Sequence, residues 1–148
     1  MGFVALEYSP PMDRRRVLFL CTHNSARSQM AEGMLRAWGG DRFDAFSAGT
    51  EATEVRPLAI RAMDELGIDI SRQQSKTLAS YEGQGFDLVV TVCDDAREAC
   101  PYFPGASRQI HWSFEDPAAA GGSEEERLAV FRKVRDQIAE RIRGELLA

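Results

Sequence analysis

The stretch VLFLCTHNSARSQMAEGML, residues 17–35, contains the pattern that decides the fold. Four apolar residues lead into Cys21, a loop of small and polar residues follows, and Arg27 comes six positions after the cysteine. The apolar run predicts a strand buried on both of its faces, and the apolar spacing over residues 28–38 predicts a helix. The loop therefore leads from the carboxyl end of a buried strand into the N-terminus of a helix.

A loop in this position is suited to binding an anion. Backbone N–H groups at a helix N-terminus attract negative charge, and the Arg27 guanidinium adds a planar fork that fits a tetrahedral oxyanion. The same field favours the thiolate form of Cys21, to which Ser28 can donate a hydrogen bond, while Asn24 can hold the loop by bonding to its backbone. The predicted oxyanion-binding residues are Thr22, His23, Asn24, Ser25, Ala26, Arg27 and Ser28.

The alternative interpretation is a buried, inert cysteine in an ordinary strand-to-helix turn. The complete Cys-x5-Arg-Ser pattern, placed after a strand and before a helix, favours the anion site. His23 is better explained as a loop residue that faces solvent than as a catalytic base.

Strands and helices alternate along the rest of the chain. Further strands are predicted over residues 43–48, 86–92 and 108–112, and further helices over residues 57–66, 94–100 and from 123 onward. We therefore expect an α/β fold, a single three-layer domain with a four-stranded parallel sheet and helices on both faces. Because sites in such folds lie at the carboxyl ends of strands, Cys21, Cys93 and the loop after Trp112 should meet at one edge.

Composition and charge exclude several classes of protein. The 148 residues are 44% hydrophobic and 28% charged, which is typical of one globular domain. The net charge of −5 argues against a nucleic-acid or membrane-surface partner, and no apolar run is long enough for a membrane helix. We expect a cytoplasmic monomer, with residues 1–13 as a flexible N-terminal extension and residues 14–148 as the domain.

The three cysteines, Cys21, Cys93 and Cys100, do not form the pattern of a secreted disulfide framework. In a reducing cytoplasm they are free thiols, either buried or reactive. His23 and His111 could join these cysteines in a zinc site, but the spacings match no standard ligand set. We predict no metal and no cofactor.

Two motifs resemble one known family. CTHNSARS, residues 21–28, resembles the phosphate loop of the low-molecular-weight protein tyrosine phosphatase fold, and FEDPA, residues 114–118, resembles its aspartate-proline motif. The resemblance extends over residues 16–148 and implies that Asp116 is the general acid for a reaction in which Cys21 is the nucleophile. The fold is host to two chemistries, phosphotyrosine hydrolysis and thioredoxin-coupled arsenate reduction.

The segment TVCDDAREACPYFPG, residues 91–105, resembles the redox segment of thioredoxin-coupled arsenate reductases. On an intact helix, residues seven apart are separated by about 10 Å, whereas a disulfide requires Cα atoms within about 7 Å. Cys93 and Cys100 can therefore bond only if the segment between them unwinds. The alternative is two half-buried thiols on a helix face.

The resemblance implies a three-cysteine relay that reduces arsenate to arsenite. Cys21 attacks arsenic, Cys93 attacks Cys21, Cys100 attacks Cys93, and thioredoxin reduces the final disulfide. Phosphate and sulfate are the expected competing oxyanions. One alternative is a phosphatase that hydrolyses phosphomonoesters through a Cys21 phosphocysteine, but Asp116–Pro117 is followed by three alanines instead of aromatic residues. Another is a thiol-based redox sensor or oxyanion-binding module without turnover.

Some reductases of this family bind potassium beside the loop, through counterparts of Asn24, Glu32, Ser47 and an aspartate. The first three are present here, and Lys76 stands at the position that matches the aspartate. The Lys76 ammonium either supplies the positive charge permanently or points into solvent.

Overall fold

The computed structural model describes residues 14–94 and 101–148 and contains a four-stranded sheet in the order β2-β1-β3-β4. All three strand pairs are parallel, as predicted. The strands are β1 Arg15–Cys21, β2 Phe43–Gly49, β3 Leu88–Thr91 and β4 Gln109–His111. The α/β fold class predicted from the sequence is confirmed. The proposed N-terminal extension lies outside the described residues.

Strands β3 and β4 are shorter than the sequence predicts, because pairing beyond their regular part is partial. Phe86 forms only an isolated bridge with Ala106, and Val92 is tied to β1 by a single bond from its N–H to the Leu20 carbonyl at 2.8 Å. The predicted helix over residues 94–100 lies almost wholly outside the described residues.

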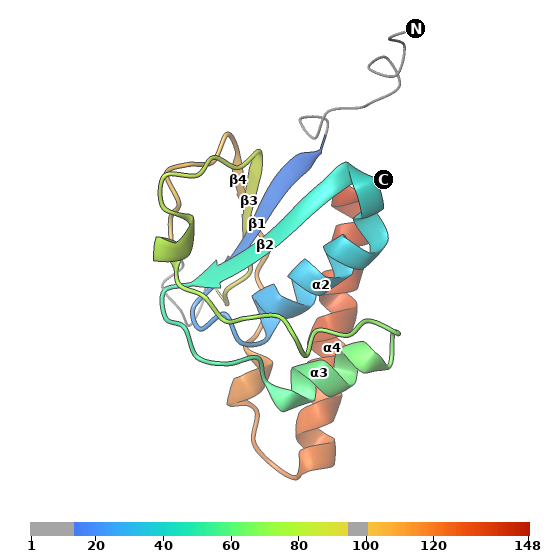
Figure 1. Cartoon of the computed structure of the whole chain (residues 1–148). Helices are drawn as coiled ribbons and strands as arrows, with labels where there is room; N and C mark the ends of the chain where they lie inside the picture. The colour runs from blue at the N-terminus through green and yellow to red at the C-terminus, as the bar shows by residue number, and fades with distance from the viewer. Residues whose placement is uncertain (1–13, 95–100) are drawn as a thin grey trace, which may run out of the picture.

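Three α-helices pack on one face of the sheet (Figure 1). They are α2 Arg27–Gly39, α3 Pro57–Asp64 and α4 Glu124–Arg141, with the π-helical turn η5 Ile142–Leu146 after α4. Within the described residues, the opposite face is covered by the 3-10 turn η3 Leu78–Tyr81 and by Phe86 and Phe103. No helix in these segments has both the length and the apolar character needed to cross a membrane.

The alternation of side chains along β1 divides the core in two. Val17, Phe19 and Cys21 join the cluster under the α-helices, and Leu18 and Leu20 join the smaller cluster on the other face. All five are at most 2% exposed, so residues 17–21 of β1 are buried on both faces, as the apolar run predicts.

Helix α4 begins with a capping box and continues with a buried apolar stripe. Ser123 Oγ accepts a bond from the Glu126 N–H at 3.1 Å, and the Glu126 carboxylate accepts one from the Ser123 N–H at 2.9 Å, which forms the capping box. The buried stripe of the helix consists of Leu128, Phe131, Val134, Ile138 and Ile142.

Gly49, the last residue of β2, touches the loop that follows β1. A Cβ atom at Gly49 would lie 2.7 Å from the Thr22 carbonyl oxygen, 2.8 Å from the Asn24 nitrogen and 2.9 Å from the Cys21 carbonyl oxygen. These three atoms belong to the backbone, so none can move without a shift of the loop itself. The absence of a side chain at Gly49 therefore sets the path of the loop.

We predict that Gly49→Ala displaces this loop and lowers the free energy of unfolding by about 2 kcal/mol, a typical cost of overpacking. Urea denaturation monitored by circular dichroism measures this loss. Gly144→Ala is the matched control, since its Cβ meets no atom within 4 Å, and it should not destabilise the protein. Equal stability of the two variants would show that the loop tolerates the added methyl group.

Candidate active site

The loop of residues 22–26 joins the end of β1 to the start of α2, as predicted. Its four consecutive carbonyls, from Thr22 to Ser25, all accept hydrogen bonds from groups outside the loop. The pairs are Glu51 N and Thr50 Oγ1 to Thr22 O at 3.0 Å each, Ser75 Oγ to His23 O at 3.2 Å, Gln29 Nε2 to Asn24 O at 3.1 Å, and Arg56 N to Ser25 O at 2.9 Å.

The direction of these carbonyls fixes the direction of the loop N–H groups. In a trans peptide the carbonyl of one residue and the N–H of the next point in opposite directions, and none of the described peptide bonds is cis. Because the carbonyls turn toward the surrounding protein, the N–H groups of residues 23–26 turn toward the inside of the loop. Asn24 permits the tight path by adopting a left-handed conformation, with φ of 47°. The loop thus forms a cradle for an anion.

Cys21 lies at the base of this cradle and is buried, with 2% of its surface exposed. Its sulfur is 2.8 Å from Ser28 Oγ, and Ser28 Oγ is itself 2.8 Å from the amide nitrogen of Asn24. Cys21 is a free thiol. The structure therefore brings together the predicted nucleophile and the predicted hydroxyl donor.

Arg27 is the first residue of α2, and its side chain is 2% exposed. One guanidinium nitrogen donates to the Phe114 carbonyl at 3.2 Å, and the other lies 3.8 Å from Asp116 Oδ2. Arg27 therefore links the cradle to the segment that carries the predicted general acid.

Asp116 caps the 3-10 turn η4 Pro117–Ala119, because its Oδ1 accepts a bond from the Ala118 N–H at 2.9 Å. This bond holds the carboxylate so that Oδ2 is the oxygen near Arg27. The side chain is 23% exposed, which gives it access to solvent protons. The carboxylate therefore lies beside Arg27, the residue that directly follows the cradle loop.

Cys93 follows β3 and is fully buried. It shares the main core cluster with Cys21, which ends β1, and it lies two residues after the end of β3, where Thr91 is opposite Leu20. The two cysteines thus lie at the same end of neighbouring strands, as predicted. Cys100 lies outside the described residues.

His23 sits on the outside of the loop. Its side chain is 38% exposed, and its Nε2 is 3.7 Å from a Glu51 carboxylate oxygen. This position agrees with a solvent-facing residue. His111, at the end of β4, bonds through Nδ1 to Thr91 Oγ1 at 2.7 Å. The described residues contain no group of three or more His, Cys, Asp or Glu side chains arranged to hold a metal ion.

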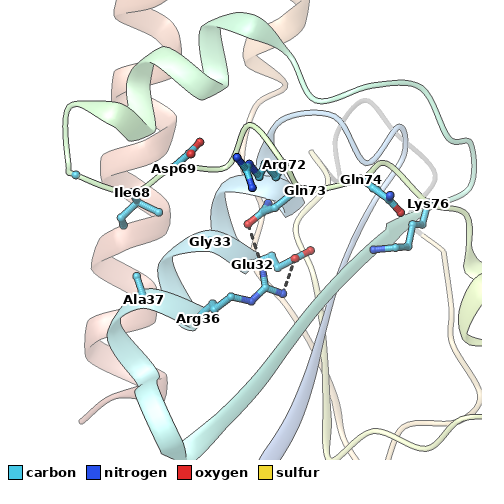
Figure 2. A pocket seen from close by; sticks show the side chains of 11 residues that line it. Glu32, Gly33, Arg36, Ala37, Ile68, Asp69, Arg72, Gln73, Gln74 and Lys76 are labelled. Carbon is cyan, nitrogen blue, oxygen red and sulfur yellow. Dashed lines mark hydrogen bonds and ion pairs between the residues drawn. The ribbon is translucent and has the colours of Figure 1, made fainter.

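The residues predicted for a cation site form two hydrogen-bonded pairs. Ser47 Oγ donates to Glu32 Oε1 at 2.5 Å, and the Lys76 N–H donates to Asn24 Oδ1 at 2.7 Å. Glu32 and Lys76 line one pocket of about 530 Å³ beside α2 (Figure 2). Arg36 Nη2 forms an ion pair with the other carboxylate oxygen, Glu32 Oε2, at 2.7 Å, a contact that the sequence does not predict.

Lys76 does not point into open solvent. Its Nζ lies 5.9 Å from the centroid of the Tyr81 ring. Burial, and to a smaller extent the negative charge of Glu32, raise the pKa of Tyr81 to about 12. The ammonium of Lys76 and the carboxylate of Glu32 therefore both act on the same side chain.

Two glutamines that the sequence analysis did not single out complete the site. Gln29 is fully buried in α2 and bonds to Asn24, and Gln73 bonds to Gln29. An amide side chain in a helix or a loop carries no sequence signal for such a role, and Gln73 lies 44 residues from Gln29 in the sequence.

Comparison with known proteins agrees with this geometry. The chain is 51% identical to an arsenate reductase from Halalkalibacterium halodurans over 89% of its length and 95% of the relative. It is 48% identical to an arsenate reductase from Bacillus subtilis, with the same coverage.

Solved structures give the same result. A structure described as an arsenate reductase in the phosphate binding state has a TM-score of 0.75 at 35% identity, covering 88% of this chain and 95% of that one. A low molecular weight protein tyrosine phosphatase from T. tengcongensis has a TM-score of 0.65 at 28% sequence identity, and the match covers 87% of this chain and 95% of that one. A thioredoxin-dependent arsenate reductase from Corynebacterium glutamicum has a TM-score of 0.62 at 26% sequence identity, and the match covers 97% of this chain and 66% of that one.

Residues 16–148 match the family described as low molecular weight phosphotyrosine protein phosphatase. With the cysteine, the anion cradle, the arginine and the aspartate all in place, the chain belongs to this family, and within it the chain is similar to proteins named arsenate reductase.

Proposed function

We propose that this protein reduces arsenate to arsenite, with Cys21 as the nucleophile and thioredoxin as the reductant that restores the enzyme. The observation that carries the proposal is the free Cys21 thiol under a loop whose N–H groups converge, in a chain about half identical to proteins named arsenate reductase. Arsenate and phosphate are both tetrahedral oxyanions, so the cradle fits either of them. Phosphate and sulfate are accordingly expected to compete with arsenate.

In the first step, the Cys21 thiolate attacks arsenic and forms a sulfur–arsenic bond. The departing oxygen leaves as water after it takes a proton from Asp116. Arg27 and the loop N–H groups hold the remaining oxygens of the thiol–arsenate adduct. The support for this step is that Arg27 directly follows the cradle loop and contacts both Phe114 and Asp116.

In the second step, Cys93 attacks the Cys21 sulfur. The electron pair of the sulfur–arsenic bond stays on arsenic, which is reduced from As(V) to As(III) and leaves as arsenite, and a Cys21–Cys93 disulfide forms. Cys21 and Cys93 share one buried cluster at the ends of neighbouring strands, which supports a direct exchange between them.

In the third step, Cys100 attacks Cys93, releases Cys21 as a thiolate and moves the disulfide to Cys93–Cys100. The dithiol of thioredoxin then reduces this disulfide. Support for the partner comes from the Corynebacterium glutamicum neighbour, which is described as thioredoxin-dependent. A reducing, cytoplasmic environment fits this chemistry.

Phosphatase activity is the second candidate function, because Cys21, Arg27 and Asp116 are also the groups that phosphomonoester hydrolysis requires. The residues after Asp116–Pro117 are Ala118, Ala119 and Ala120, which provide no ring to stack on an aryl substrate. We therefore expect only weak hydrolysis of aryl phosphates. A redox sensor without turnover, the third possibility, would show neither activity.

We further propose that the Lys76 ammonium supplies the positive charge that a bound potassium ion would otherwise provide. It lies over the Tyr81 ring, beside the charge of Glu32, and its backbone N–H holds the side chain of Asn24. Any cation in this place stabilises the Glu32 carboxylate and the loop that Asn24 belongs to.

The relay makes a clear prediction for Cys100→Ser. This variant should release about one arsenite per enzyme and then stop, because Cys100 is needed only after the substrate has been reduced. Peptide mass analysis should then find a Cys21–Cys93 disulfide. Hydrolysis of p-nitrophenyl phosphate should persist in this variant, and Cys21→Ser should abolish both activities. If Cys100→Ser turns over arsenate repeatedly with thioredoxin, the three-cysteine relay is wrong.

The Lys76 proposal predicts how the enzyme responds to potassium. Replacing sodium by potassium at constant ionic strength should leave the wild-type rate of arsenate reduction unchanged, since the site already holds a cation. Lys76→Asp removes that cation and adds an oxygen ligand, so the rate should fall in sodium and recover in potassium. Strong potassium activation of the wild type, or no potassium response in Lys76→Asp, would contradict the proposal.

A further inference from the structure

The orientation of the Gln29 amide is determined by its neighbours. Its Nε2 faces three oxygens, the Asn24 carbonyl at 3.1 Å, Asn24 Oδ1 at 2.9 Å and the Gln74 carbonyl at 3.0 Å. Only a nitrogen can donate to these oxygens. The Gln29 oxygen therefore faces the other way, where it accepts a bond from Gln73 Nε2 at 2.8 Å.

The orientation of the Asn24 amide follows from the same reasoning. Its Oδ1 receives the Lys76 backbone N–H at 2.7 Å, a group that can only donate, as well as Gln29 Nε2. Its Nδ2 must then be the atom that faces Ser28 Oγ at 2.8 Å.

These two orientations decide the direction of the bond between Ser28 and Cys21. The Ser28 hydroxyl carries one hydrogen, and it accepts from Asn24 Nδ2. Its hydrogen is thus available to the Cys21 sulfur at 2.8 Å. A hydroxyl that donates to sulfur stabilises the thiolate, which is the form that acts as nucleophile.

We infer that Gln29 and Gln73 are positioning residues that keep Cys21 in its nucleophilic form. Gln29 holds both the carbonyl and the side chain of Asn24, and Asn24 orients Ser28 toward the sulfur. Gln73 braces Gln29 from the pocket side, since its Nε2 also donates to the Gln29 carbonyl at 3.0 Å. Gln29 bonds to the cradle at Asn24, and Gln73 bonds to Gln29, so both act through Asn24.

Substitution of Gln29 separates this role from simple packing. Gln29→Glu has nearly the same shape but places an oxygen against three oxygens, so it should disturb Asn24 more than Gln29→Met, which merely loses the donor. A packing role predicts the opposite order, because methionine lacks the planar end of the amide. Gln137→Met, on the exposed face of α4, is the matched control.

The rate at which iodoacetamide alkylates Cys21 in the reduced protein, followed by peptide mass across pH, reports the thiolate directly. We expect the alkylation rate at neutral pH to fall about tenfold in Gln29→Glu and about threefold in Gln29→Met, as loss of a hydrogen bond implies. The midpoint of the pH profile should move to higher pH in both variants. Gln137→Met should match wild type. Protection by inorganic phosphate shows that the modification occurs in the cradle.

Wild-type alkylation profiles in both Gln29 variants would overturn the inference, and so would an effect in Gln29→Glu alone, since that would reflect only its charge. If Gln29→Glu does not fold, Gln73→Met carries the test with a smaller decrease in the same direction, and an unchanged profile there contradicts the inference. In arsenate reduction, which rests on the proposed function, the variants should lower kcat more than they raise KM. If the wild type does not reduce arsenate but the alkylation rates follow the expected order, the proposed function alone is refuted.

Discussion

The outward hydrogen bonds of four consecutive carbonyls, from Thr22 to Ser25, are the constraint on which the rest of the site depends. Their donors come from the segment after β2, from the segment before η3 and from Gln29 in α2, so the cradle exists only when these parts of the fold are assembled. Gly49 makes this possible because the loop backbone occupies the space of its missing side chain. The fold therefore pre-organises the N–H groups before any anion arrives, which is the condition for strong electrostatic stabilisation of a transition state.

A second layer of hydrogen bonds sets the chemistry of Cys21. Asn24 connects the cradle with this second set of hydrogen bonds, since its backbone shapes the cradle and its side chain orients Ser28. Because buried amides have separate donor and acceptor ends, the chain of bonds from Gln73 to Ser28 has a single direction. The Lys76 backbone N–H also donates to the side chain of Asn24, and the Lys76 ammonium brings a positive charge to the pocket that Glu32 lines.

The strand–loop–helix unit was predictable because its signals are local: an apolar run, a cysteine, a polar loop and an arginine at fixed spacing. Cys21, Arg27 and Ser28 follow from that pattern, and the structure brings Asp116 to Arg27 as the resemblance implied. Most partners of the loop carbonyls were not predictable, because they lie in irregular segments whose contacts are long-range. Gln73 was missed for the same reason, and Gln29 was missed because a glutamine in a helix carries no signal that its amide bonds to the preceding loop. The roles of Cys93 and Cys100 stay predictions.

The central claim is that arsenate gains two electrons as the thiols of Cys21 and Cys93 become a disulfide, and that Cys100 then releases Cys21. Titration of free thiols after one equivalent of arsenate, without thioredoxin, tests it most directly, together with a measurement of arsenite. Starting from three cysteines per fully reduced chain, the account predicts the loss of two thiols for each arsenite released. Release of arsenite with all thiols intact, or loss of thiols without arsenite, would contradict it.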